Sequence, residues 1–253
     1  MKKAVKVVLI IAFWVAIWWI LSLIIDNVLL FPDPLTVLAR LGQMTITADF
    51  WISLLTSILR VMLGIILAIV LGTLIAFLCA KVKIVYDILY PFMTVIKATP
   101  VASFIILIVL FIGKDTVPSI ISLLMVMPVV WANVYEGIKN IDISLKEVCT
   151  VYKLSPIKKL KVLYLPSVMP YFLSAVLSSI GLGWKAGIAA EILYPPLKSI
   201  GKAMMDAKSL FITEDLFAWT FVVVALSLLF ELIIKLSFKF NPKKKAGAKD
   251  ENN

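Results

Sequence analysis

The stretch from Val7 to Ile25 carries no charged side chain, and this feature limits most strongly how the chain can fold. As an α-helix the stretch is about 28 Å long at 1.5 Å per residue, which matches the roughly 30 Å hydrocarbon core of a bilayer. Similar apolar runs recur along the whole chain, and 62% of its residues are hydrophobic. Because soluble domains are about 45–50% apolar, the sequence predicts an integral membrane protein.

The apolar runs predict an all-α protein with six transmembrane helices. Helices satisfy their own backbone hydrogen bonds inside lipid, and the short alternating strands of a membrane barrel are not seen in the sequence. The predicted spans cover residues 7–25, 51–80, 86–113, 116–137, 162–192 and 216–236. We expect residues 1–240 to form a single transmembrane domain, followed by a disordered polar tail at 241–253.

The positions of the basic residues predict the orientation in the membrane. When the N-terminus is placed inside, most of the 25 lysines and arginines fall in inner segments, and loops rich in such residues stay in the cytosol. We therefore expect a multi-pass protein of the cell membrane with both termini cytosolic. The net charge of +10 is then explained by orientation, without nucleic-acid binding.

Two outer segments are predicted to carry structure of their own. Residues 31–41, FPDPLTVLARL, predict a short helix with Asp33 as its cap and Pro34 at its first position. We expect this helix to lie on the membrane surface. Residues 195–213 open with two prolines and are mixed in polarity, which indicates a re-entrant or surface segment.

The long inner loop, at about residues 138–162, also contains helix signals. Ser144 followed three residues later by Glu147 fits a capping box, in which serine caps the helix and glutamate bonds back to the serine backbone. This pattern predicts a helix over about 145–154. In this interpretation Glu147 stabilises the start of its own helix, and this role is compatible with a contact to a partner.

A second helix is predicted directly after the first. Ser155 fits an N-terminal cap, and Pro156 fits the first helical position. The helix is basic and leads into the fifth span. Its lysines are Lys158, Lys159 and Lys161, which can enforce orientation or contact anionic lipid without any specific partner.

From Glu147 to Pro166 the loop resembles the signature of binding-protein-dependent ABC importer permeases. That signature reads Glu-Ala-Ala, three residues, Gly, nine residues, Ile, any residue, Leu-Pro. Here Glu147 opens it and Leu165-Pro166 closes it at the family's spacing, with Leu163 in place of isoleucine.

Three positions depart from this signature. Val148 and Cys149 replace the alanines, and Lys153 stands where the family has glycine. A lysine adopts the left-handed conformation less readily than glycine does. The sequence therefore leaves open whether the turn stays at Lys153 or moves to Leu154-Ser155.

Other segments resemble the nitrate, sulfonate and taurine branch of the same family. They are residues 31–41, 56–64, 97–113, 181–193 and 215–231. The similarity therefore extends over nearly the whole chain. It implies the type I ABC importer permease fold and a translocation pathway for a small, anionic solute.

The resemblance also implies partners. Two ATPase subunits would bind ATP-Mg, a second permease subunit, expected to be identical, would complete the channel, and an extracytoplasmic binding protein would deliver the solute. The loop would couple the permease to the ATPase, with Glu147 meeting a basic residue there. The residues implied in coupling are Ser144, Glu147, Val148, Cys149, Lys153, Leu154, Ser155, Pro156, Leu163, Leu165 and Pro166.

Charged residues inside the predicted spans require an explanation, because a charge in the bilayer costs several kcal/mol. We expect a pathway favourable to anions, lined by Arg60, Lys97, Pro100, Lys185 and Glu191. The proline would free a backbone carbonyl near the lysine. The alternative is that the basic side chains pair with carboxylates or carbonyls of the chain itself. Lys185 and Glu191 share a helix face only if the helix breaks near residue 187.

The motifs of common enzymes are not found in the sequence. It contains no GxxxxGK[ST] phosphate-binding loop, no HExxH and no GxSxG. We therefore expect a non-catalytic membrane subunit without a cofactor of its own. The expected solute resembles nitrate, a sulfonate or taurine. The alternatives are a vitamin-type precursor, such as a thiamine pyrimidine or riboflavin, and an ATP-independent carrier.

Overall fold

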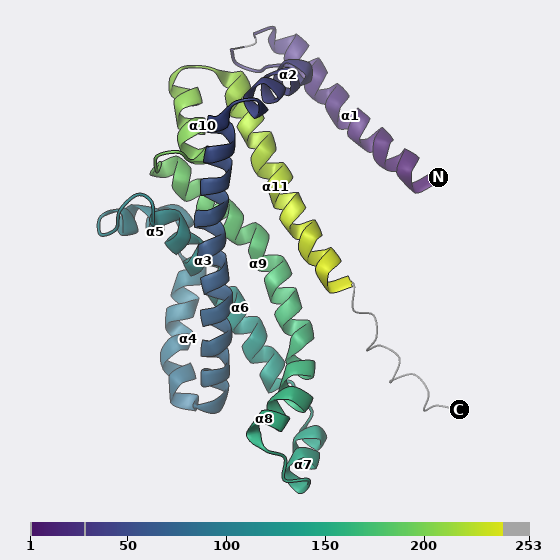
Figure 1. Ribbon diagram of the computed structural model, residues 1–253, viewed down its shortest axis with the longest axis vertical. Helices are drawn as coiled ribbons and strands as arrows, with labels where there is room; N and C mark the ends of the chain where they lie inside the picture. The colour runs from purple at the N-terminus through teal and green to yellow at the C-terminus, as the bar shows by residue number, and fades with distance from the viewer. Residues whose placement is uncertain (1, 28, 240–253) are drawn as a thin grey trace. The chain divides into compact units, whose positions relative to one another are not determined.

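The computed structural model describes residues 2–27 and 29–239, and its elements in these residues are helices. Figure 1 shows their order along the chain. The helices are α1 (Lys2–Ile25), α2 (Pro34–Thr45), α3 (Ala48–Lys81), α4 (Lys83–Ala98), α5 (Val101–Val109), α6 (Val117–Lys139), α7 (Ile143–Val151), α8 (Pro156–Lys159), the π-helical turn η1 (Leu160–Tyr164), α9 (Leu165–Leu193), α10 (Ile200–Ser209) and α11 (Thr213–Lys239). The predicted tail at 241–253 lies outside the described residues.

Among the described residues, five helices are long and apolar enough to cross a membrane, and a sixth crossing arises if α4 and α5 count as one broken span. The five are Val5–Ile25, Ala48–Lys81, Val117–Lys139, Pro156–Leu193 and Thr213–Ser237. The predicted all-α membrane fold is thereby confirmed.

The third predicted span, 86–113, is not one straight helix. Its two parts, α4 and α5, are bent by 103° at a break that contains Thr99 and Pro100. Thr99 has an extended backbone, with ψ at 131°, because proline disfavours the helical conformation in the residue before it. The break therefore divides the predicted third span into two separate helices.

The described residues fall into two compact units, one within Met1–Leu59 and Ile188–Ala225 and the other within Arg60–Gly187 and Leu226–Asn253. In the first unit, α2 begins as predicted. The Asp33 carboxylate accepts hydrogen bonds from the backbone N–H groups of Leu35 and Thr36, with proline at the first position. The Thr36 hydroxyl also donates to this carboxylate, and together these bonds lower the pKa of Asp33.

An ion pair and a ring stack join the helices of the first unit. Arg40 in α2 forms a two-pronged pair with Asp215 in α11, and its hydrogen bond to Asp215 raises the pKa of Arg40. The rings of Phe50 in α3 and Trp219 in α11 stack with their centroids 4.9 Å apart. These contacts connect three helices that are far apart in the sequence.

In the second unit, residues of α3, α6 and α9 pack closely because small residues lie at the contacts. A Cβ atom at Gly64 would meet the Ser119 carbonyl oxygen at 2.0 Å. A Cβ atom at Gly187 would meet the Ser122 Oγ at 2.5 Å. Glycine at both positions therefore permits the close approach that is typical of membrane helix packing.

Candidate functional site

The first loop helix, α7, begins two residues earlier than predicted. Its cap is Asp142, whose carboxylate accepts a hydrogen bond from the Ser144 N–H at 2.8 Å. The predicted capping box at Ser144 is therefore wrong, because Ser144 already lies in the first turn of the helix. Aspartate and serine are equally good caps, so the sequence pattern alone did not distinguish the two positions. Glu147, which is exposed, now lies too far along the helix to complete a capping box.

The turn that follows α7 is at Lys153 and has not moved to Leu154-Ser155. Lys153 adopts the left-handed conformation, with φ at 47°. Its N–H donates to the Thr150 carbonyl at 3.0 Å, and the Leu154 N–H donates to the Cys149 carbonyl at 3.1 Å. These two bonds form a Schellman motif, which normally has glycine at the left-handed position. Lys153 therefore occupies the left-handed position of this turn.

The surface of α7 carries exposed apolar side chains. Leu145, Val148 and Tyr152 lie at spacings of three and four residues, which places them on one face of the helical stretch. Tyr152 is 74% exposed, and the other two are about half exposed. Cys149 is buried. Exposed apolar side chains grouped in this way on a short polar loop indicate a surface for a protein partner.

The second loop helix continues into a membrane helix. Ser155 caps α8 by accepting a hydrogen bond from the Lys158 N–H, and Pro156 occupies the first position, as predicted. The helical path then continues through η1 into α9, so that Pro156–Leu193 is one candidate span. Leu163 is buried in η1, whereas Leu165 and Pro166 are exposed. Figure 1 shows α7 and α8 together at the end of this path.

The structure gives Arg60 an acidic neighbour. Its Nη2 atom lies 2.5 Å from Asp115 Oδ1, in the turn between α5 and α6. The Ser119 hydroxyl donates to the Arg60 carbonyl at 2.7 Å. This arrangement corresponds to the alternative stated for Arg60, pairing within the chain itself.

Glu191 is completely buried in the first unit. Its Oε2 accepts hydrogen bonds from the Ser57 hydroxyl at 2.7 Å and from the Gly201 N–H at 3.3 Å. The Ser57 oxygen also accepts from the Ile200 N–H at 2.9 Å. The carboxylate therefore lies at the N-terminus of α10, where a negative charge is favoured by the helix dipole.

Lys185 lies on the same helix as Glu191 but differs from it in surroundings. Helix α9 runs without a break through residue 187, so the two side chains are not brought onto one face. Lys185 is exposed, whereas Glu191 is buried. Helix α9 therefore does not contain the break that a shared face would require.

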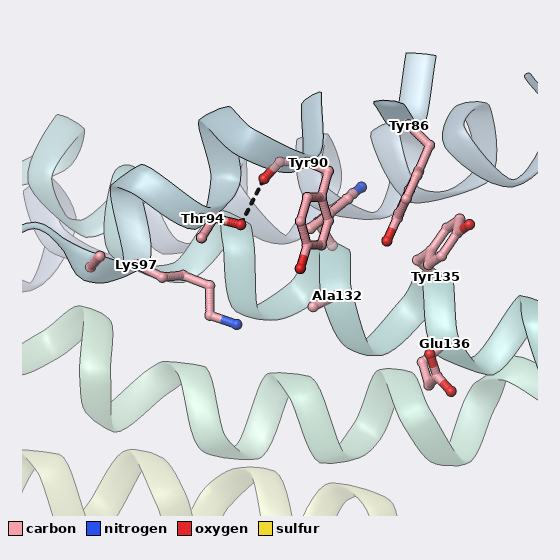
Figure 2. Close-up of a pocket in the computed structure, with 9 residues that line it drawn as sticks. Tyr86, Tyr90, Thr94, Lys97, Ala132, Tyr135 and Glu136 are labelled. Atoms are coloured by element: carbon pink, nitrogen blue, oxygen red, sulfur yellow. Dashed lines mark hydrogen bonds between the residues drawn. The ribbon is translucent and has the colours of Figure 1, made fainter. Parts of the chain in front are cut away.

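Lys97 contributes to a groove that the sequence analysis did not identify. The groove has a volume of about 480 Å³ and lies between α4 and α6. Figure 2 shows the side chains that line it. They are Tyr86, Tyr90, Thr94, Lys97, Ala98, Trp131, Ala132, Tyr135 and Glu136. A usable signal existed in the sequence, because Tyr86 and Tyr90 on one helix, and Trp131 and Tyr135 on the other, have the four-residue spacing of a shared face.

These features define a class of protein, a helical membrane subunit with a capped and exposed loop helix. One of its apolar spans is broken at Pro100, and its sequence lacks a phosphate-binding loop. The chain belongs to the family of binding-protein-dependent transport system inner membrane components, whose sequence pattern matches residues 64–244. It is thus a non-catalytic permease component of the inner membrane. The family's transport systems also contain a binding protein and an ATPase.

Known relatives carry names that refer to two kinds of anion. The chain is 26% identical to the Bacillus subtilis protein named as an aliphatic sulfonates transport permease, SsuC, over 88% of this chain and 81% of the relative. It is 31% identical to the Escherichia coli protein of the same name over 56% of this chain and 51% of that relative. It is 33% identical to the bicarbonate transport system permease CmpB of Synechocystis over 39% of this chain and 35% of that protein.

Proposed function

We propose that this permease component lines the pathway of an ATP-driven importer for a small anion and is driven through α7. The observation that carries the proposal is the form of α7. It is capped at its N-terminus by Asp142, closed at its C-terminus by the turn at Lys153, and exposes Val148 and Tyr152. A helix fixed at both ends can dock as one unit and transmit a displacement.

The path from α7 to the membrane supports this role. Helix α7 contacts η1, and η1 continues directly into α9. A displacement of α7 by an ATPase would therefore reach α9 without an intervening flexible loop. Glu147 is exposed and does not complete a capping box, so its carboxylate can meet a basic residue of the ATPase.

The proposed assembly contains this chain twice, two ATPase subunits that bind ATP-Mg, and an external binding protein. The family's name supports the last two kinds of partner. The docking residues are those of the loop, with Leu145, Val148 and Tyr152 providing the apolar contact. Pro156, Leu163, Leu165 and Pro166 would serve the same coupling by fixing the path from the loop into the membrane.

The names of the relatives and the basic side chains within the membrane region together favour an anionic solute. Sulfonates and bicarbonate are both anions, and Lys97 and Lys185 are exposed basic side chains within helices of the membrane region. Pro100 would contribute by bending the span beside Lys97. Arg60 and Glu191 would act indirectly. Arg60 holds the turn after α5 through Asp115, and Glu191 holds α3 through Ser57.

The test is co-purification of the permease with its ATPase subunit. Val148→Glu places a charge on the exposed apolar face of α7 and should abolish recovery of the ATPase. Thr150→Glu is the matched control, because Thr150 is exposed on a different face of the same helix and should leave recovery unchanged. If Val148→Glu and Leu145→Glu both retain the ATPase at the level of the control, the docking proposal is wrong.

A further inference from the structure

The groove between α4 and α6 has the size of a small-molecule site. Its volume of about 480 Å³ lies within the roughly 300–1,000 Å³ range of ligand pockets. All of its lining residues belong to the second compact unit. It is therefore described within one packed part of the chain, in which α4 and α6 contact each other.

One wall of the groove consists of aromatic rings. The rings of Tyr86 and Tyr135 stack with centroids 4.5 Å apart and planes 16° apart, and Trp131 stacks against Tyr86 at 5.8 Å. Trp131 is 4% exposed and forms the floor, whereas Tyr90 is 51% exposed at the rim. These stacked rings pack against one another, and the exposed ring of Tyr90 beside them offers a face on which a second flat group can stack.

Polar groups lie at either end of this aromatic wall. Figure 2 shows the Lys97 ammonium on one side of Tyr90, with Tyr135 and Glu136 on the other side. In the described part of the chain no carboxylate forms an ion pair with Lys97. Glu136 accepts a hydrogen bond from the Asn140 side chain at 3.0 Å. The groove thus offers an uncompensated positive charge next to a flat apolar surface.

We propose that this groove binds the transported solute, and that the solute is an organic anion with a flat, ring-containing body, such as an aromatic sulfonate or carboxylate. The anionic group contacts the Lys97 ammonium, and the ring stacks on the exposed ring of Tyr90. This inference rests on the proposed function, since it names the class of solute that the permease component carries.

Two physical arguments separate this class from simpler anions. An uncompensated ammonium in a membrane segment is costly, so an anion that reaches Lys97 is stabilised there. An inorganic oxyanion gains nothing from the rings, because a strongly hydrated ion loses water at an apolar surface without compensation. A ring-containing anion gains both the charge contact and the stacking contact.

The experiment measures binding to the intact permease–ATPase complex in lipid nanodiscs, by calorimetry, with benzenesulfonate, ethanesulfonate, bicarbonate and an uncharged aminopyrimidine as probes. Benzenesulfonate should bind more tightly than ethanesulfonate by about tenfold, because the ring adds a stacking contact. Lys97→Gln should weaken both sulfonates by about tenfold or more, since it removes a charged partner. Tyr90→Leu should weaken benzenesulfonate alone.

Matched controls lie on the same helix outside the groove. Lys83→Gln removes a positive charge at the start of α4, and Phe92→Leu removes an exposed ring from α4. Both should leave binding unchanged. The inference is overturned if the aminopyrimidine or bicarbonate binds as tightly as benzenesulfonate, or if Lys97→Gln and Tyr90→Leu behave like the controls. Because the complex used already contains the ATPase, such a result would reject the solute class while the coupling proposal stands.

Discussion

Lys153 shows that a lysine can hold the left-handed backbone conformation at a position where the family signature has glycine. The lysine has a φ of 47° at the end of α7, where a side chain costs roughly 1–2 kcal/mol relative to a right-handed conformation. The turn persists because two backbone hydrogen bonds hold it. The family's glycine would form the same turn without that cost.

The first prediction follows from this cost. Lys153→Gly should raise the free energy of unfolding by about 1 kcal/mol, measured as a higher thermal unfolding midpoint of the purified permease. Lys158→Gly is the comparison, because Lys158 lies inside α8 with a helical neighbour on each side, and glycine should lower stability there. A loss of stability in Lys153→Gly would contradict the assigned turn.

The buried carboxylate of Glu191 leads to the second prediction. Ser57→Ala removes a donor to Glu191 and the acceptor for the Ile200 N–H. Leaving buried polar groups without these bonds should cost about 1–3 kcal/mol, seen as a lower unfolding midpoint. Ser178→Ala is the control, since the Ser178 hydroxyl donates to carbonyls of its own helix. Equal midpoints for the two variants would show that the contact with α10 contributes little.

At the residue scale, the sequence predicts the N-terminal cap of a helix well only where a single capping residue lies near the start of the helix. Asp33 and Ser155 were both predicted as caps, and each is followed by proline at the first helical position. Ser144 failed because Asp142 lies two residues earlier and caps the same turn. The partners of Glu191 were beyond prediction, because Ser57 is far from it along the chain and only the fold brings them together.

Among the elements, the long apolar helices were predictable and the breaks were not. The hydrophobic runs alone locate α1, α3, α6, α9 and α11, since length and composition decide whether a helix can cross lipid. The bend between α4 and α5 depends on Pro100, and a window of hydrophobicity that covers residues 86–113 does not locate it. The continuity of α8, η1 and α9 likewise depends on backbone geometry that periodicity does not encode.

The third prediction concerns the link between α3 and the turn after α5. Arg60 is 19% exposed and Asp115 is 72% exposed in their ion pair, so the pair is partly screened and worth up to about 1 kcal/mol. If Arg60 acts through this pair, Arg60→Gln and Asp115→Asn should reduce stability and anion uptake to the same extent. The double variant should be no worse than either single variant.

The contrary outcome for this pair is equally specific. If Arg60→Gln reduces uptake of an anion into proteoliposomes while Asp115→Asn does not, then Arg60 contacts the solute directly. Lys114→Gln is a control for charge alone, because Lys114 is the residue before Asp115 in the same turn. Its effect on uptake should be smaller than that of either member of the pair.

For the whole molecule, the sequence predicted the class of protein and missed the groove. The membrane character follows from hydrophobicity alone and is confirmed by the candidate spans, whereas the orientation and the coupling role of the loop stay predictions. The groove arises only when α4 and α6 contact each other, so that Tyr86 stacks on Tyr135 across two helices. Lys97 was identified as a pathway candidate from its charge, but its aromatic neighbours depend on tertiary packing.

The last prediction tests whether the loop drives the membrane helices as one rigid path. Lys161→Gly combined with Val162→Gly places two flexible residues in η1, between the docking helix and α9. Because glycine weakens a helix by about 1 kcal/mol per residue, this path should lose its stiffness while α7 remains intact. The ATPase should still co-purify, and ATP-driven uptake of the solute carried by the binding protein should fall by about tenfold or more.

The control for this experiment is the pair Lys208→Gly and Ser209→Gly at the end of α10, which lies outside the path from α7 to α9. It should preserve most of the uptake. Three results are distinguishable. Loss of the ATPase would mean that η1 itself is part of the docking surface, and full uptake with the ATPase bound would reject the rigid connection. If uptake is lost while the ATPase still co-purifies, the mechanical link is supported. In that case η1 is needed for transport but not for binding of the ATPase.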